Sequence, residues 1–151
     1  MEKIWLKSYP AGVPAEIDTS GIPSLKALCE RSFAEFSSLP AYVQMGHALT
    51  YGELDRLSTQ FGAWLPQGLG LRKGDRVAIM LPNVLQYPVV LFGALRAGLT
   101  VVNTNPLYTA PELEHQLRDS GAQVIIILEN FCSTLQKVLA STSVQLSLIH
   151  I

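Results

Sequence analysis

The sequence contains few charged residues. They make up 15% of the 151 residues, against roughly 25% in an ordinary soluble domain, while hydrophobic residues make up 48%. The formal net charge of −1 gives no electrostatic basis for binding nucleic acid, so we expect no nucleic-acid partner. A chain with this balance is expected to have surfaces that contact more protein, either further polypeptide of its own or a partner.

Residues that form disulfides or bind metals are also scarce. The two cysteines, Cys29 and Cys132, are far apart and have no metal-ligand spacing, which favours reduced thiols in a cytosolic protein. The histidines His47, His115 and His150 include no pair at ligand spacing. The first fourteen residues contain no apolar run long enough for a secretory signal. We therefore predict no metal ligand in this chain.

One apolar stretch, Val77–Val102, is long enough to span a bilayer. Prolines, amides and an arginine interrupt it: Pro82, Asn83, Gln86, Pro88 and Arg96. Its β-branched residues cluster at the two ends and its helix-forming residues lie in the middle. That change of character favours a strand, a helix and a second strand over a single membrane helix.

The pattern of apolar runs predicts an α/β fold. Short branched runs at 76–81, 100–103 and 123–128 are separated by helical segments at 84–97 and 111–120. Strands that alternate with helices in this way are typical of a parallel sheet with crossover helices. The length fits one domain or part of a larger one.

The segments before and after this unit are expected to be a mixture of short elements. Residues 1–23 should form an extended arm that lies on the surface of a body. Ser24 should cap a helix that runs to about Ser37, and Gly46-His47 should turn a hairpin. A helix should follow whose inward face is Leu54, Leu57, Phe61, Trp64 and Leu65, and a last helix should begin near residue 130.

Helix boundaries can be predicted from local residue pairs. Thr50 with Glu53, and Thr109 with Glu112, have the spacing of a capping box. Asn83 is expected to cap the helix at 84–97, and Pro88 is expected to delay the start of its regular part by a residue or two. Pro66 is expected to end or kink the helix that precedes it.

The residues form no recognisable catalytic motif. Glycines at 68, 70 and 74 follow a predicted helix and precede a strand, the reverse of the order that presents backbone amides to a pyrophosphate. His115 lies beside Glu112 and Glu114, but we interpret these carboxylates as a cap and an ion-pair partner. The residues alone predict an α/β scaffold without a recognisable active site.

Three stretches nevertheless resemble one enzyme superfamily. They are LTYGELDRLS at 49–58, KGDRVAIMLPNVLQYPVVLFGALRAG at 73–98 and VVNTNPLYTAPELEHQLRDSGA at 101–122. These are similar to the adenylate-forming acyl-CoA synthetases. With IWLKSYPAGVPAEID at 4–18, they resemble the amino-terminal portion of bacterial long-chain fatty acid–CoA ligases from about Ile4 to about Val144.

The resemblance implies a fold, a reaction and its cofactors. Members have a large amino-terminal region of layered sheets and helices and a small mobile carboxy-terminal domain. They activate a long-chain fatty acid with ATP and Mg²⁺ to an acyl adenylate, from which coenzyme A displaces AMP. Their phosphate loop and catalytic segments lie downstream, so no catalytic, cofactor-binding or metal residue is carried over. Pro66 and Pro111 depart from the family pattern, the latter replacing a basic residue.

These observations predict a fragment with three parts. Residues 1–23 are the arm, 24–145 are part of an AMP-dependent synthetase/ligase amino-terminal domain, and 146–151 are a truncated or non-native tail. We expect the fragment to be inactive and to need the missing remainder of its own chain. The parent is expected in the cytoplasm, with peripheral contact at the inner face of the cell membrane and a homodimer as open possibilities. The alternatives are a ligase for a medium-chain or aryl acid, and a non-catalytic α/β binding module.

Overall fold

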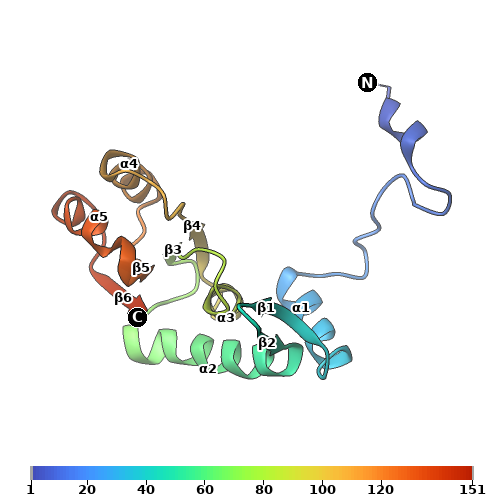
Figure 1. Ribbon diagram of the computed structural model, residues 1–151, viewed down its shortest axis with the longest axis horizontal. Coiled ribbons are helices and arrows are strands. Elements are labelled where there is room, and N and C mark those ends of the chain that lie inside the picture. The colour runs from blue at the N-terminus through green and yellow to red at the C-terminus, as the bar shows by residue number, and fades with distance from the viewer. Residues whose placement is uncertain (1, 151) are drawn as a thin grey trace.

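The structure, a computed structural model, describes residues 2–150 and, at 149 and 150, the backbone alone. Its centre is a four-stranded parallel sheet with the strand order β4-β3-β5-β6 (Figure 1). The strands are β3 (Arg76–Met80), β4 (Thr100–Asn103), β5 (Val124–Leu128) and β6 (Leu146–His150). The predicted α/β class, with its parallel sheet and crossover helices, is confirmed.

Two helices make the crossovers between the first three strands. Helix α3 (Gln86–Arg96) joins β3 to β4, and α4 (Ala110–Ser120) joins β4 to β5. Val77 of β3 lies beside Val101 on one side and Val124 on the other. The stretch 77–102 therefore forms a strand, a helix and a strand, as predicted. None of the helices within residues 2–150 has both the length and the apolar character needed to cross a membrane.

Each face of the sheet has its own apolar core because side chains alternate along a strand. Figure 1 shows α2 (Tyr51–Leu69) and α3 on one side of the sheet, with α4 and α5 (Cys132–Gln136) on the other. The α2/α3 face holds Val77 and Ile79, together with Val124 and Ile126. The α4/α5 face is formed by Ala78, Met80, Leu113, Leu117, Ile125, Ile127, Leu135 and Val138.

A third, smaller core joins the segment before the sheet to α2. Helix α1 (Leu25–Glu35) and the hairpin of β1 (Pro40–Gln44) and β2 (His47–Thr50) pack around buried Phe33, Leu49 and Leu54. The backbone N–H of Ala27 donates to Ser24 Oγ at 3.1 Å, which confirms the predicted cap. The hairpin turns at Met45-Gly46, one residue earlier than predicted. Both residues have positive φ angles, of 49° and 81°, as this tight hairpin turn requires.

Two predictions about helix ends are wrong: α2 does not end at Pro66, and Asn83 does not cap α3. A kink at Pro66 stays a prediction. Helix α2 continues through Pro66 to Leu69 and ends at Gly70, whose φ is 69°. The proline keeps its carbonyl, which accepts a hydrogen bond from Gly70 N at 3.1 Å, so the turn after it survives. Asn83 caps nothing, because α3 begins at Gln86. Pro88 then falls in the first turn, where backbone N–H groups have no partner within the helix.

The segment before Ser24 is irregular except for one 3₁₀ turn, η1 (Ile4–Ser8). Figure 1 shows it leading away from the sheet rather than lying against it. Lys3 pairs with Glu16 inside this segment. The segment does not lie on the surface formed by residues 24–150, and its role as an arm stays a prediction.

The region after β5 is less regular than the single predicted helix. It divides into η2 (Glu129–Phe131), α5 and η3 (Leu139–Ser141). Strand β6 then pairs in parallel with β5, and Leu146 lies beside Val124. Backbone pairing is possible for almost any side chains, so the origin of residues 146–150 stays a prediction. Residue 151 lies outside the described residues.

Candidate functional site

The carboxyl ends of β3, β4 and β5 meet at one edge of the sheet. Ligands of open α/β sheets bind at this edge, outside the ends of the strands. The segments that follow the three strands are 81–85, 104–109 and 129–131, and they contain no glycine, lysine or arginine. They therefore lack both the backbone freedom and the positive charge with which a triphosphate is usually held.

The polar groups at this edge mainly form hydrogen bonds with other groups of the same chain. Tyr87 Oη donates to Asn103 Oδ1 at 3.0 Å, and Gln116 Nε2 donates to the carbonyl oxygen of Asn103 at 3.0 Å. Buried Thr104 donates through its N–H to the carbonyl oxygen of Ile79 at 3.0 Å. Hydroxyl and amide groups in this arrangement can orient a neutral polar ligand, but they form no pair of nucleophile and base.

The two capping carboxylates are occupied at helix ends. Glu53 Oε2 accepts from the backbone N–H and from Oγ1 of Thr50, both at 2.9 Å. Glu112 Oε2 accepts from the same groups of Thr109 at 2.8 and 2.6 Å. The backbone hydrogen bond from Thr50 lowers the pKa of Glu53, and the hydroxyl of Thr109 lowers the pKa of Glu112. Both predicted capping boxes are confirmed, and neither carboxylate is poised as a general acid.

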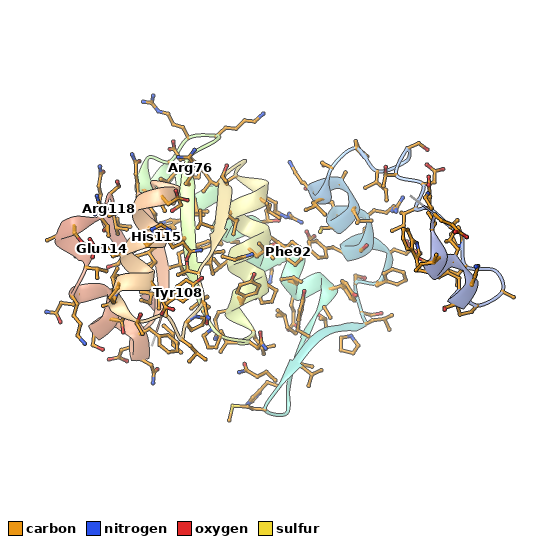
Figure 2. The ribbon with its side chains drawn as sticks, turned by 90° about the horizontal axis from the view of Figure 1, so that it is seen from above. Arg76, Phe92, Tyr108, Glu114, His115 and Arg118 are labelled. Atoms are coloured by element: carbon orange, nitrogen blue, oxygen red, sulfur yellow. The ribbon has the colours of Figure 1, made fainter. Side chains whose placement is uncertain are left out.

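The two histidines whose side chains the structure describes, His47 and His115, lie on separate elements. His115 lies on the exposed face of α4 with Glu114 and Arg118, around a shallow depression of about 470 Å³ (Figure 2). Glu114 pairs with Arg118 at 3.5 Å, as predicted. His47 belongs to the hairpin, and the side chain of His150 is outside the described set. Across residues 2–150, no group of three or more His, Cys, Asp or Glu side chains could hold a metal ion.

An apolar cleft of about 490 Å³ opens on the α2/α3 face of the sheet. Its lining consists of Leu49, Leu57, Phe61, Trp64, Leu81, Leu85, Gln86, Val89, Val90, Ile126 and Leu148. Only one of these side chains is polar and none is charged. Of the five residues that helical spacing predicted to face inward from α2, Leu54 and Leu65 are fully buried. The other three line the cleft, and Trp64 is 41% exposed there. Helical spacing could not show that part of this face would remain uncovered, because local sequence does not specify the opposite wall.

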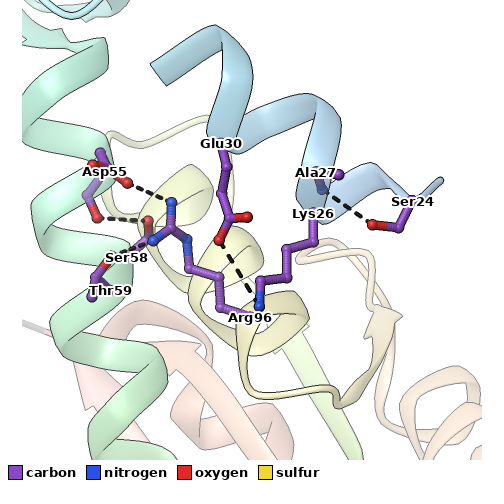
Figure 3. A network of polar contacts seen from close by, with 8 residues as sticks. All are labelled: Ser24, Lys26, Ala27, Glu30, Asp55, Ser58, Thr59 and Arg96. Carbon is purple, nitrogen blue, oxygen red and sulfur yellow. Dashed lines mark hydrogen bonds and ion pairs between the residues drawn. The ribbon is translucent and has the colours of Figure 1, made fainter. Parts of the chain in front are cut away.

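A second feature missed from the sequence is the set of contacts made by Arg96 at the end of α3 (Figure 3). Its guanidinium group forms an ion pair with Asp55 and a hydrogen bond with Thr59, both on α2. The same group lies 5.4 Å from the centre of the Phe33 ring on α1. Arg96 is largely buried and ties three helices together, which explains its place in the structure without a catalytic role.

Comparison with known proteins identifies the family. The model of the AMP-binding enzyme family matches residues 29–150, which is most of the chain. The chain belongs to the AMP-binding enzyme family. This AMP-binding enzyme chain is 58% identical over 145 residues to the long-chain-fatty-acid–CoA ligase of Salmonella typhimurium. It is 42% identical over 128 residues to the ligase of the same name from Bacillus subtilis.

The aligned residues make up nearly all of this chain but only a small share of each relative. The alignment with the Salmonella typhimurium ligase covers 96% of this AMP-binding enzyme chain and only 26% of the relative. The chain thus spans about a quarter of the length of that relative. The same disproportion holds for the Bacillus subtilis ligase, of which 22% is covered.

Solved structures show the same fold. An anthranilate CoA ligase in complex with anthranoyl-AMP superposes with a TM-score of 0.81 at 22% identity, covering 89% of this chain and 27% of that one. A fatty acyl CoA synthetase of Mycobacterium tuberculosis gives a TM-score of 0.76 at 26% identity, covering 83% and 26%. The described residues therefore have the architecture of one part of these larger AMP-binding enzymes.

Proposed function

We propose that this chain is the amino-terminal part of a long-chain fatty acid–CoA ligase. The observation that carries the proposal is the gradient of identity among relatives. Identity is 58% over 96% of the chain for a long-chain ligase, and 32% over 80% of the chain for a 4-coumarate–CoA ligase-like protein of Oryza sativa. A ligase for an aryl or medium-chain acid remains the first alternative.

The proposed reaction of the parent has two steps. The carboxylate of the fatty acid attacks the α-phosphorus of ATP, and pyrophosphate leaves. The thiol of coenzyme A then attacks the acyl carbon, and AMP leaves. The first step is needed because a carboxylate is a poor electrophile, and esterification to AMP supplies a leaving group. Activation of this kind needs cations and oriented donors around the phosphates, Mg²⁺ among them.

The residues described here do not fit ATP or Mg²⁺. The segments after the strands lack glycines and cations, and the carboxylates of Glu53 and Glu112 hold helix ends. We therefore derive no catalytic step from these side chains. The proposal assigns the chemistry to the rest of the parent, and gives this chain the role of scaffold.

Contacts between the helices support the proposed scaffold role. Asp55 and Arg96, which are 41 residues apart in the sequence, join α2 to α3, and both helices pack on the sheet. Tyr87 and Gln116 hold Asn103 from α3 and α4, on either side of the strand that ends there. The two contacts at Asn103 fix the carboxyl edge of the sheet, at which the remaining polypeptide of the parent would place its substrates, whereas the pair of Asp55 and Arg96 fixes α3 at its other end.

The test is an exchange assay on the parent, recovered with its downstream region. We expect the parent to exchange labelled pyrophosphate into ATP when palmitate is present, and to form palmitoyl-CoA once coenzyme A is added. The 151-residue chain is the matched control and should show no exchange. A parent that responds to 4-coumarate or octanoate, but not to palmitate, would move the assignment to the first alternative. Exchange by the 151-residue chain itself would place the chemistry within it and contradict the scaffold role.

A further inference from the structure

We propose that residues 2–18, which we call the amino-terminal loop, bind a phospholipid bilayer. The uncharged turn of the loop would enter the boundary between the lipid headgroups and the acyl chains, and the attraction would be apolar rather than electrostatic. The inference goes beyond the proposed function, because it does not depend on which acid the parent activates.

The first support is that these residues close into a compact loop. Lys3 near one end forms an ion pair with Glu16 near the other. Between them the chain reverses in a turn, in which the N–H of Val13 donates to the carbonyl oxygen of Pro10 at 3.2 Å and Gly12 has a φ of 89°. Surface loops whose ends are held together in this way often carry a function.

The second support is the exposure of the loop. Figures 1 and 2 both show it beyond α1, on the side away from the sheet. None of residues 2–18 is buried. Five large apolar side chains of the loop are between 42% and 85% exposed: Ile4, Trp5, Tyr9, Val13 and Ile17. Apolar side chains gathered on one exposed segment mark a site of contact with a protein or a membrane.

The distribution of charge favours a membrane. Residues 8–15, which include the turn, contain no charged side chain, and the charges of the loop lie toward its two ends, at Glu2, Lys3, Lys7, Glu16 and Asp18. Besides the pair of Lys3 and Glu16, Lys7 pairs with Glu2 at 3.8 Å. A bilayer offers an apolar layer and a hydrated headgroup layer within a few ångströms of each other. The turn can enter the first layer while the charged ends stay in the second.

The aromatic residues of the loop suit the boundary between these layers. Trp5 and Tyr9 each combine an apolar ring with one polar group, and such side chains are enriched at membrane–water interfaces. Lys3 and Lys7 lie on either side of Trp5, and their amino groups can stay in water while their stems contact lipid. The one regular element within residues 2–18 is the short 3₁₀ turn η1. The loop therefore offers a protein groove neither a strand edge nor an α-helix.

The net charge of the loop sets the kind of attraction. Residues 2–18 contain two lysines against three carboxylates, so they have no excess of positive charge. Polybasic segments need anionic lipid, and salt weakens their binding. This loop should instead bind neutral and anionic bilayers about equally well, with little dependence on salt.

Tryptophan fluorescence in the presence of vesicles tests the proposal. The chain has two tryptophans, so Trp5 is the only one left in the variant Trp64→Phe. We expect the emission of Trp5 to shift to shorter wavelength when phosphatidylcholine vesicles are added. It should also be quenched when the acyl chains carry bromine near the headgroup. Emission that stays unchanged as lipid is added would overturn the proposal.

A pair of substitutions locates the binding. Val13→Asp should lower the vesicle partition coefficient at least about tenfold, because it places a carboxylate on the turn that enters the bilayer. Leu107→Asp is the matched control, since Leu107 is 83% exposed and lies far from the loop in the chain, and the new charge is the same. It should leave the partition coefficient almost unchanged. Similar losses for both variants would show that the loop is not the binding element.

Three further outcomes would also overturn the proposal. If the parent floats with phosphatidylcholine vesicles regardless of Val13→Asp, other polypeptide covers the loop in the whole protein. If the emission of Trp5 shifts without vesicles as the chain becomes more concentrated, the loop joins two copies. If binding needs phosphatidylglycerol and disappears at high salt, the attraction is electrostatic. None of these outcomes bears on whether the parent activates palmitate, so the proposed function is tested separately.

Discussion

The two faces of the central sheet differ in how completely the chain covers them. On the α4/α5 face, Leu113, Leu117, Ile125 and Ile127 are fully buried. On the α2/α3 face the strand residues are buried as well, but the helix side chains around the cleft are only partly covered. The closed face is formed by helices that directly precede and follow β5, whereas the open face depends on α2, which comes before the sheet.

The difference shows which packing is local and which needs distant polypeptide. A crossover helix is placed on its sheet by the strands at its two ends, so α4 covers its face as soon as β4 and β5 have both paired with β3. Helix α2 is held by contacts with α3, among them the ion pair between Asp55 and Arg96. It covers only part of the open face, so the apolar cleft stays open beside it.

The largest expected effect is on the closed face. Leu117→Ala should lower the free energy of unfolding of the 151-residue chain by about 2–5 kcal/mol, because it leaves a cavity among fully buried neighbours. Trp64→Ala on the open face should cost only about 1 kcal/mol in the same chain, since its ring is already partly hydrated. Urea unfolding followed by circular dichroism measures both. Equal losses would show that the two faces are equally well packed.

The next effect tests how tightly the helix pair on the open face is packed. A β-carbon added at Gly62 of α2 would lie 2.7 Å from the backbone oxygen of Gly93 on α3. Gly62→Ala should therefore cost about 1–3 kcal/mol, despite the better helix propensity of alanine. Gly21→Ala is the control, because nothing lies within 4 Å of its added carbon, and it should stay within about 0.5 kcal/mol. Urea unfolding again gives the measurement, and a neutral Gly62→Ala would mean that α2 and α3 can separate freely.

Removing a helix cap should have a smaller effect on stability, and the effect should be the same on both faces of the sheet. Thr50→Ala removes the cap of α2, and Thr109→Ala removes that of α4. Each should cost about 1 kcal/mol, because a cap satisfies backbone N–H groups within its own turn, whatever the rest of the helix packs against. Thermal melting of both variants checks this. A much larger loss for Thr109→Ala would mean that the closed face magnifies the cost of a local defect.

The smallest effect is the dependence of stability on pH. Hydrogen bonds from Thr50 and Thr109 lower the pKa values of Glu53 and Glu112 in the folded state. Their contribution to stability is therefore full above the unfolded pKa of about 4.3, and is lost as the pH falls through the lower folded values. Urea midpoints measured between about pH 5 and pH 3 should fall more steeply for the wild type than for the double variant Glu53→Gln, Glu112→Gln. Parallel profiles would show that the carboxylates add nothing in their ionised form.

Much of the fold could be predicted because its signals are local. The branched apolar runs of β3, β4 and β5 were recognisable from a few residues each, and the capping boxes from four. Each of these patterns depends on neighbours in the chain, so no knowledge of the tertiary structure was needed. The resemblance of three stretches to acyl-CoA synthetases likewise required only residue order, and the family is confirmed.

Other features were decided only when distant segments met. Pro66 stays within α2 and Asn83 caps no helix, because hydrogen bonding in the surrounding turns outweighs the preference of the single residue. Arg96 looked like an interruption in an apolar stretch, yet its charge is matched by Asp55, 41 residues earlier. The sequence by itself determined which side chains face inward from α2. Only the tertiary structure decided that some of them line an open cleft, since burial depends on what stands opposite.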